Sequence, residues 1–474
     1  MGRLAGKMEG TLKAGEWAVE EFGAAELGNT LRTVRLVTLA TRMAESPKGM
    51  VTSVFSAASE RVGAYRFLES GRISVRSILA SCAQAAIRRA AGAEWMFVAV
   101  DGSSLTFRDR CGRRGLGAIG TYRQASRGLK TMTSIGIGMD GTPLGLLDLQ
   151  WWTRQATESQ KGTRFKRQTS EKETKWWLEA IRSVEAACQR AGSGTRPWFQ
   201  LDREGDFHDL LCSMSTQTTG RITVRVAQNR RVASGDVAYL WDEMHSQAAG
   251  GSYAVAVSAA PQRQARQAHM VVRWAQVDLL LRKRPGGAFG RTPTRLWAVL
   301  ALETGTVPAG EKPVQWLLLT NAPIANFYAA AEVLFGYSLR WRVEEFHRTW
   351  KSECQVEQCQ LHQAGRIQLW ATILAAVAMR IERLKYLARN EPETPASVEF
   401  TRNEIDAVIV LRRPAGYHRG ETPSIAQVVR WVADLGGYIG PSNGPPGAKV
   451  ISRGLQRVEP VALALLYLDQ EKPA

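Results

Sequence analysis

The sequence lacks the features that mark disulfide-rich, zinc-ribbon and membrane-spanning proteins. Its six cysteines form no CxxC pair, which argues against a zinc ribbon and against a disulfide framework. No apolar run approaches the roughly 18 residues that a membrane-spanning helix needs, because the run 369–379 stops at Arg380. The first residues carry no apolar export signal. We therefore expect a cytoplasmic protein with reduced cysteines and no membrane partner.

Acidic residues are also scarce relative to basic ones. Among 474 residues, 62 are Lys or Arg and 44 are Asp or Glu, which gives a formal charge of +18. An excess of this size needs a negative partner, and nucleic acid is the leading one. A basic surface that only aids solubility is the alternative. The length allows two or three domains with a large buried core.

The N-terminal region is predicted to be helical. Ala, Leu, Glu and Arg recur at helical spacing over residues 11–90, and Asn29 is placed to cap one of the helices. On that helix Leu31 is expected to face inward, while Arg32 and Arg35 lie one turn apart on a basic stripe. Such a stripe suits a DNA groove, and it equally suits solvent.

Two apolar segments are predicted to be buried strands that end in aspartate. WMFVAVDGSS is expected to end at Asp101, and PWFQLDREGD at Asp202. Between them, an Asp-Gly turn is expected to join two further strands as a hairpin. A stretch of some 140 residues after Asp202 is too long for a loop, and we take about 228–318 as a β-rich insertion. Helices are expected to follow.

The stretch SLRWRVEEFHRTWKSE places two acids side by side in a basic helix. At about 100° per residue, Glu344 shares a face with Arg340 and Lys351, whereas Glu345 points elsewhere, in a supporting or solvent-facing position. An acid between cations is explained by a salt bridge, or by a metal ligand set among phosphate-binding groups. The two strand-end aspartates favour the metal, because three carboxylates suit Mg²⁺ when phosphate and water complete its shell.

Taken with their surroundings, these residues resemble a known family. Asp101 in VAVDGSS, Asp202 in LDREGD and a YREK series are similar to the acid triad and signature helix of bacterial cut-and-paste DDE transposases. The series consists of Tyr337, Arg340, Glu344 and Lys351. The family is that of insertion sequence four, and the transposon five group within it is especially similar. The resemblance spans most of the chain and weakens beyond residue 390.

The resemblance implies an α/β fold with a ribonuclease-H-like catalytic core and helical terminal domains. Residues 1–75 would form a helical domain that binds transposon-end DNA. Residues 76–385 would form the catalytic domain, with the β-rich insertion at about 228–318. Residues 386–474 would form a helical C-terminal domain that mediates dimerisation.

A catalytic metal site is implied in the same way. Asp101, Asp202 and Glu344 would be both the catalytic residues and the metal ligands, for two Mg²⁺ ions per site, with Mn²⁺ able to substitute. Glu204 and Asp206 lie close to Asp202 in the sequence. They are interpreted as capping or solvent-facing residues, so that Asp202 remains the expected ligand.

The DNA contacts implied by the resemblance come from the N-terminal region and the catalytic region. They are Tyr337, Arg340, Lys351, Trp316, Arg225, Arg32 and Arg35. Trp316 would stack on a base flipped out near the cut, although a bulky strand residue in a core is the alternative. Arg32 and Arg35 would contact the transposon end, and Arg225 would bind DNA near the active site; each could equally face solvent.

The implied activity is cut-and-paste transposition. The protein would bind terminal inverted repeats, cleave the transposon ends through a hairpin intermediate by two-metal phosphoryl transfer, and join the 3′ ends to target DNA. Its partners would be double-stranded DNA and a second copy of itself in the synaptic complex. The alternatives are a catalytically silent DNA-binding inhibitor or domesticated relative, and a nuclease that cuts without joining. We expect a bacterial cytoplasmic, nucleoid-associated protein.

Overall fold

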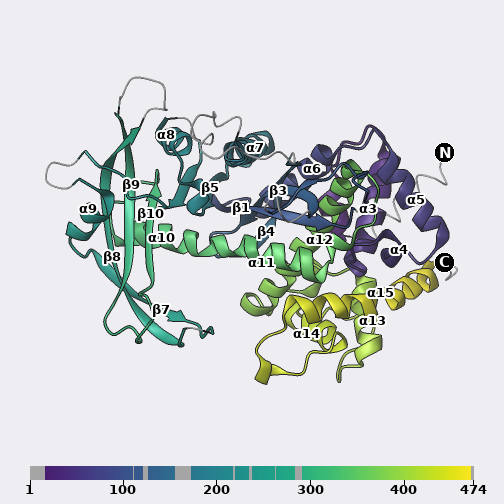
Figure 1. Cartoon of the computed structure of the whole chain (residues 1–474). Coiled ribbons are helices and arrows are strands. Elements are labelled where there is room, and N and C mark those ends of the chain that lie inside the picture. The colour runs from purple at the N-terminus through teal and green to yellow at the C-terminus, as the bar shows by residue number, and fades with distance from the viewer. Residues whose placement is uncertain are drawn as a thin grey trace.

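A computed structural model shows a mixed α/β protein with a large central sheet and helical N- and C-terminal regions, which lie together at one end of the molecule (Figure 1). The structure describes residues 16–109, 111–120, 126–154, 172–216, 219–233, 238–261, 263–282 and 291–470. Two segments rich in basic residues, 154–174 and 282–287, fall largely outside this part of the chain.

The N-terminal region is helical, as predicted. Its helices are α2 (Glu16–Phe22), α3 (Thr30–Glu45), α4 (Val51–Val54), α5 (Ala58–Glu69) and α6 (Val75–Arg89). The Asn29 side chain caps α3 by accepting a hydrogen bond from the backbone N–H of Leu31 at 2.7 Å. The prediction that Leu31 faces inward is wrong, because its side chain is 56% exposed. The buried stripe of α3 begins one turn later, at Leu36.

One sheet runs through the middle of the molecule in the order β2-β3-β1-β5-β6-β10-β9-β8-β7, and β4 pairs with β3. Its first strands are β1 (Trp95–Phe107), β2 (Gly117–Ala118), β3 (Arg127–Ile137), β4 (Pro143–Trp152), β5 (Arg196–Leu201) and β6 (Arg221–Arg225). The pairs β1–β5 and β5–β6 are parallel, and the other pairs are antiparallel. The predicted hairpin is present as β3 and β4, with Gly141 at φ +94° in its turn.

The prediction that the first strand ends at Asp101 is wrong, because β1 continues to Phe107. The reason lies in its two neighbours. Pairing with β5 stops at Ala99, whereas pairing with β3 continues through Asp101 to Phe107. Asp101 therefore lies inside β1, just beyond the last residue of β1 that pairs with β5. The second strand does end as predicted, since Asp202 directly follows β5.

The predicted β-rich insertion continues the same sheet. Its strands are β7 (Gly251–Val257), β8 (Arg266–Arg282), β9 (Arg291–Thr304) and β10 (Gln315–Thr320), and it includes helix α9 (Leu240–Ser246). Strand β10 pairs with β9 on one side and with β6 on the other. The insertion is thereby joined to the strand that adjoins β5.

Helices cover both faces of the sheet (Figure 1). One buried cluster packs α7 (Lys175–Ala191), α8 (His208–Thr216) and α9 against the strands. The other cluster involves α10 (Phe327–Ser338), α11 (Arg342–Arg348) and α12 (Ala364–Asn390). The helix expected around Glu344 is not uniform. A 3₁₀ turn (Leu339–Trp341) precedes α11, and a π-helical segment (Thr349–Glu353) follows it.

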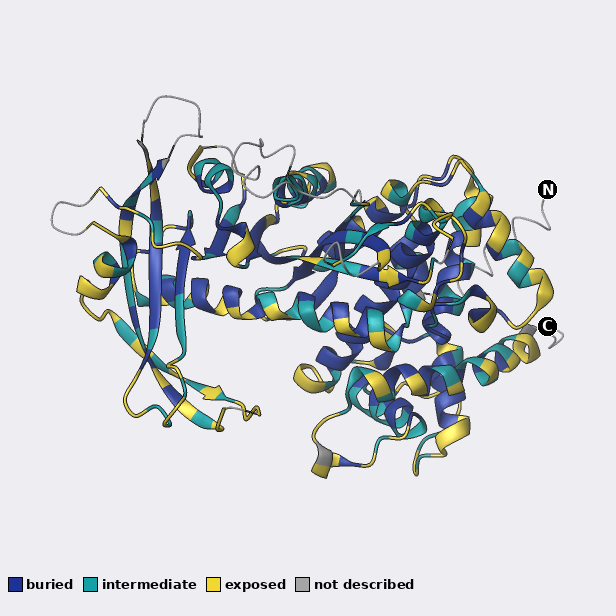
Figure 2. Ribbon diagram, viewed as in Figure 1, coloured by how far each residue is buried: buried dark blue, intermediate teal, exposed yellow. Residues whose placement is uncertain are grey.

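Helix α12 forms the centre of the core. It is long and apolar enough to cross a membrane, but 78% of its most apolar window is buried inside the protein. It packs against the N-terminal helix α3, strand β4 and the C-terminal helix α14, and its dark-blue course through the molecule can be followed in Figure 2. Its apolar composition is thus explained by burial within this chain.

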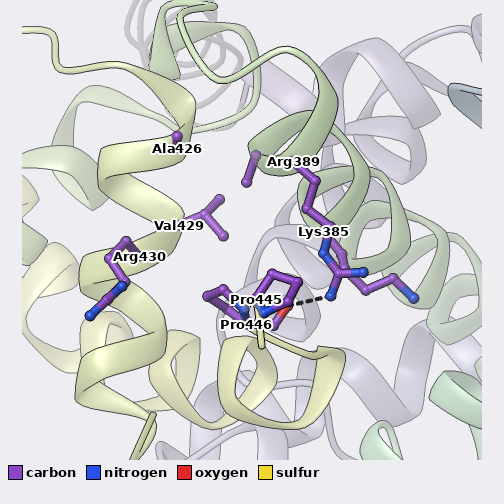
Figure 3. Close-up of a pocket in the computed structure, with 8 residues that line it drawn as sticks. Lys385, Arg389, Ala426, Val429, Arg430, Pro445 and Pro446 are labelled. Carbon is purple, nitrogen blue, oxygen red and sulfur yellow. Dashed lines mark hydrogen bonds between the residues drawn. The ribbon is translucent and has the colours of Figure 1, made fainter. Parts of the chain in front are cut away.

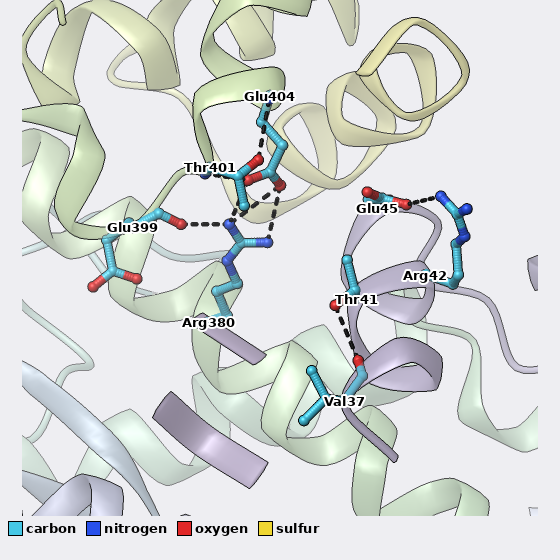
Figure 4. Close-up of polar contacts among 8 residues, drawn as sticks. All are labelled: Val37, Thr41, Arg42, Glu45, Arg380, Glu399, Thr401 and Glu404. Atoms are coloured by element: carbon cyan, nitrogen blue, oxygen red, sulfur yellow. Dashed lines mark hydrogen bonds and ion pairs between the residues drawn. The ribbon is translucent and has the colours of Figure 1, made fainter. Parts of the chain in front are cut away.

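The C-terminal region is helical, as predicted, with α13 (Arg402–Arg412), α14 (Ile425–Leu435) and α15 (Ala448–Gln470). A buried ion pair attaches it to α12. Arg380 of α12 donates to Glu404 of α13 at 3.3 Å and to the backbone oxygen of Glu399 (Figure 4). Both Arg380 and Glu404 are 4% exposed. This contact fixes where α13 begins relative to the core.

Candidate active site

The three predicted acids come from three different elements that meet beside β1. Asp101 lies in β1, Asp202 follows the neighbouring parallel strand β5, and Glu344 lies in α11. The Asp202 side chain accepts a hydrogen bond from the backbone N–H of Glu204 at 2.8 Å. Helix α11 packs directly on β1. The structure therefore brings together residues that are separated by up to 243 positions in the sequence.

Asp101 lies close enough to the other two acids to sense their negative charges. Burial raises the pKa of Asp101 to about 7; the negative charge of Asp202 adds to this rise, and so, more weakly, does that of Glu344. Arg340 and the backbone N–H of Gly102 oppose the rise. A divalent cation relieves repulsion among carboxylates. These three oxygen-donating side chains are therefore of the type that binds such a cation.

The three carboxylates are not arranged to coordinate a metal ion together. Among the residues that the structure describes, no group of three or more His, Cys, Asp or Glu side chains is placed to hold a metal ion. The reason is visible at Glu344, whose carboxylate forms an ion pair with Arg340. The salt bridge that the sequence left open as an explanation is thus present, alongside the convergence of the acids.

Arg340 occupies the space between two of the acids. Its Nη2 binds Glu344, and its Nη1 lies 3.6 Å from Oδ2 of Asp101. Nη1 is buried, yet it has no hydrogen-bond partner within the described residues. A buried guanidinium nitrogen without an acceptor is unfavourable. A phosphate oxygen that enters between the acids would supply the missing acceptor.

Three further predicted residues form a group, in which Tyr337 is close to Arg340 and the other two are close to Tyr337. Tyr337, at the end of α10, is 5% exposed, and its ring meets that of Trp316 edge-to-face at 5.4 Å. Trp316 is half-buried in β10. Arg225 of β6 donates to the backbone oxygen of Gln315 at 3.2 Å. Burial raises the pKa of Tyr337, and the charges of Arg225 and Arg340 oppose that rise. These side chains therefore form one group beside the acids.

Lys351 reaches the same site from the π-helical segment. Burial lowers the pKa of its amine, whereas the negative charges of Glu357 and Asp101 act in the opposite direction. Glu357 is held in place by the backbone N–H of Thr106 at 2.7 Å. A half-buried amine that already senses Asp101 is well placed to bind a phosphate near the acids.

The structure separates Asp202 from the two acids that follow it. The Asp206 side chain is fully buried and forms an ion pair with Arg230. It also accepts hydrogen bonds from the backbone N–H groups of Ala227 and Gln228, at 2.8 and 3.0 Å. The interpretation of Asp206 as a capping or solvent-facing residue is therefore wrong, because its buried carboxylate holds a loop; Glu204 is exposed. This supports the choice of Asp202 among the three acids.

Two residues beside the acids had no assigned part in the sequence-based site. His347 is buried and lies 3.0 Å from the Thr133 hydroxyl. Burial, with a smaller contribution from Lys351, lowers its pKa to about 3, so that it stays neutral. Trp341, next to Arg340, is 60% exposed, which leaves a face free for base stacking. Its signal in the sequence was an aromatic residue within a basic run.

Arg32 and Arg35 are not brought to the acids, because they lie on α3 in the N-terminal region. Nη1 of Arg32 donates to the backbone oxygen of Leu27 at 2.7 Å. Arg35 is exposed and rests against Gly63 of α5. The two residues belong to a separate basic surface.

A cavity of about 420 Å³ lies between α12 and α14, away from the acids (Figure 3). It is lined by Lys385, Ala388, Arg389, Ala426, Val429, Arg430, Pro445 and Pro446. Arg389 crosses it to donate to the backbone oxygen of Pro446 at 2.8 Å. Because its lining contains no carboxylate, the cavity is no candidate for metal-assisted chemistry.

Three protein-family models match the chain. The model described as Transposase DNA-binding matches residues 14–73, the Transposase DDE domain matches 212–380, and the Transposase Tn5 dimerisation domain matches 376–467. The DDE match contains Glu344, and it begins after Asp101 and Asp202. The DNA-binding match covers the N-terminal helices, and the DDE match covers the later strands with α10, α11 and part of α12. The dimerisation match covers the end of α12 and the C-terminal helices.

Proposed function

Because the chain belongs to the DDE transposases of the transposon five type, we propose that it excises a DNA element at its terminal repeats and joins the 3′ ends to target DNA. Asp101, Asp202 and Glu344 carry out the phosphoryl transfers, and the ends are released through a hairpin intermediate. The convergence of these three acids on the edge of β1 supports this assignment. The surrounding fold is a ribonuclease-H-like core.

The catalytic domain requires divalent cations in this proposal. DDE transposase domains generally use such ions, and here Asp101, Asp202 and Glu344 would hold two Mg²⁺, with Mn²⁺ as a substitute. When bound, a pair of such ions activates the attacking oxygen and stabilises the leaving one. The carboxylate of Glu344 would exchange its ion pair with Arg340 for the cation.

Side chains around the acids position the DNA. Arg340, once released from Glu344, donates to the phosphate through Nη1 and Nη2, and Lys351 neutralises charge on the same strand. Tyr337 and Arg225 hold the neighbouring phosphate. The same residues serve the first cut by water, the attack of the new 3′ hydroxyl on the opposite strand, the reopening of the hairpin, and joining to the target.

Trp316 is proposed to stack on a base flipped out beside the cut. Trp316→Ala should then reduce hairpin formation about 10- to 100-fold, because a stacking contact contributes roughly 1–3 kcal/mol. The first nick should change much less, since it needs no flipped base. Gel analysis of nicked and hairpin products measures both steps. Trp297→Ala, at a half-buried tryptophan of β9, is the matched control. If both variants reduced nicking and hairpin formation to the same extent, the role of Trp316 would be packing within the sheet and not base stacking.

We assign end recognition to residues 1–75, catalysis to 76–385 and dimerisation to 386–474.

Arg35→Ala is expected to weaken binding to the terminal repeat and to reduce the slope of log K against log salt by about 1, because one phosphate contact is lost. Fluorescence anisotropy over a salt series measures that slope. Arg190→Ala, at an exposed position of α7, provides the control. An unchanged slope in Arg35→Ala would place this arginine in solvent.

The whole proposal is tested with purified protein and DNA that carries its own terminal repeats. Hairpin and strand-transfer products with Mg²⁺, and binding alone with Ca²⁺, are the expected result. Binding without products under both conditions would identify a silent DNA-binding relative. Nicking without joining would identify a structure-guided nuclease.

A further inference from the structure

A buried polar cluster links the helix that carries Glu344 to the central helix α12. Thr349, in the π-helical segment, is 2% exposed, and its hydroxyl donates to Oε1 of Glu382. Oε2 of Glu382 forms an ion pair with Nζ of Lys385. Glu382 and Lys385 are 4% and 5% exposed. The cluster therefore lies in the interior, where an ion pair needs good partners to offset the loss of hydration.

The cluster extends to the residue beside Glu344. Nζ of Lys385 lies 3.8 Å from Oε1 of Glu345, and Nη1 of Arg342 lies 3.0 Å from Oε2. Glu345 is thus held by α12 from one side and by the first turn of α11 from the other. The Glu345 side chain points away from Glu344 and toward α12.

The π-helical segment is what this cluster holds in place. The backbone N–H of Cys354 donates to the oxygen of Thr349 at 2.9 Å, five residues earlier, and the indole N–H of Trp350 donates to Ala371 of α12 at 3.2 Å. A π turn inserts an extra residue into an α-helix and is less stable than the regular form, so that it needs support from outside. Loss of that support would let the segment revert to α-helix.

Such a change would alter the site, because Lys351 follows Thr349 by two residues and Glu344 precedes it by five. One residue of helix corresponds to about 100° of rotation. A shift in the π segment would therefore turn Lys351 away from Asp101 while Glu344 stayed in place. The relative position of the two side chains depends on the π segment.

We propose that Thr349, Glu382 and Lys385 are positioning residues that set Lys351 and Glu344 relative to each other, with Glu345 as their anchor on α11. This inference rests on the proposed function of Glu344 and Lys351. The cluster touches neither DNA nor the cation. It acts through the π segment and α11.

A second buried ion pair on α12 offers a matched control. Arg380 and Glu404 are as buried as Glu382 and Lys385, and they join α12 to α13 instead of α11. Glu404→Gln should lower the melting temperature without changing cleavage by the folded protein. A residue that only stabilises α12 would behave in the same way.

The test compares Thr349→Val, Thr349→Ser, Glu382→Gln and Glu404→Gln in the full-length protein. Thr349→Val removes the hydroxyl at constant shape, and Thr349→Ser restores it. We expect Thr349→Val and Glu382→Gln to lower the cleavage rate at saturating DNA by about 10- to 100-fold and to raise the Mg²⁺ concentration for half-maximal rate. End binding in Ca²⁺ should stay unchanged, and Thr349→Ser should cleave like the wild type.

Hydrogen exchange separates the failure of this inference from the failure of the proposed function. Amides of 342–353 should exchange faster in Thr349→Val and Glu382→Gln than in the wild type or in Glu404→Gln. If the wild type did not cleave, the proposed function would fail, and exchange would still decide whether the cluster holds the segment. Wild-type cleavage by Thr349→Val, or an equal loss in Glu404→Gln, would overturn the inference, as would unchanged exchange.

Discussion

Replacing Glu344 by glutamine should reduce DNA cleavage by about 10³-fold or more while binding to the terminal repeats is retained. The carboxylate is proposed to hold a divalent cation, and such a cation contributes several kcal/mol to stabilisation of the transition state. Glutamine keeps the size of the side chain but loses the charge. End binding should persist, because it is assigned to the N-terminal helices α2–α5 and not to α11. Single-turnover cleavage and anisotropy measure the two properties.

The salt-bridge explanation of Glu344 makes a different prediction. If its only role were the ion pair with Arg340, Glu344→Gln would lower stability modestly, since an i,i+4 pair on a helix contributes about 0.3–0.5 kcal/mol, and cleavage would change by a few-fold at most. Glu204→Gln is the control for charge, because Glu204 is an exposed acid beside Asp202. Cleavage near the wild-type level in Glu344→Gln would remove Glu344 from the catalytic set.

Replacing Gly454 by valine should unfold the C-terminal helices and abolish dimerisation. A Cβ atom at Gly454 would lie 1.8 Å from the backbone oxygen of Val432, and one at Gly436 would lie 1.8 Å from that of Val450. The backbones of α14 and α15 thus touch at two glycines, so a side chain must force the helices apart. Overpacking of this kind typically costs about 1–3 kcal/mol, and more where backbone must move.

The effect of Gly454→Val is measured by thermal unfolding and by light scattering after size exclusion with terminal-repeat DNA. The matched control is Gly447→Ala, at the start of the same region, where a Cβ atom would meet nothing within 4 Å. Dimerisation is assigned to this region by the family match over 376–467. A dimer with unchanged stability in Gly454→Val would show that α14 and α15 can separate without loss.

Local sequence signals predicted the elements well because local hydrogen bonds and apolar spacing specify them. The cap at Asn29, helix α12 and the β3–β4 hairpin all follow from residues that are neighbours in the chain. The candidate acids were proposed in the same way, from their expected places in two strands and a helix. Their meeting was inferred from the type of metal site that three carboxylates suit and from the resemblance, because no local signal states which strands become neighbours.

The failures have one physical cause, which is that non-local partners override local patterns. The sequence placed Asp101 at the end of a strand, but the long pairing with β3 carries the strand past it. It placed Leu31 in the core, but α3 meets the core only from Leu36 onward. In both cases the deciding contact comes from a distant or later part of the chain.

The two adjacent glutamates show the same difference between what local sequence specifies and what distant contacts decide. By itself, the sequence determined that Glu344 and Glu345 point in different directions, because about 100° of helix separates successive residues. Only the tertiary structure decided which distant residues lie near each one: Asp101 of β1, which shares Arg340 with Glu344, and Lys385 of α12, which contacts Glu345. The helix period is a property of the local backbone, whereas the partner of a side chain depends on which distant elements pack against it.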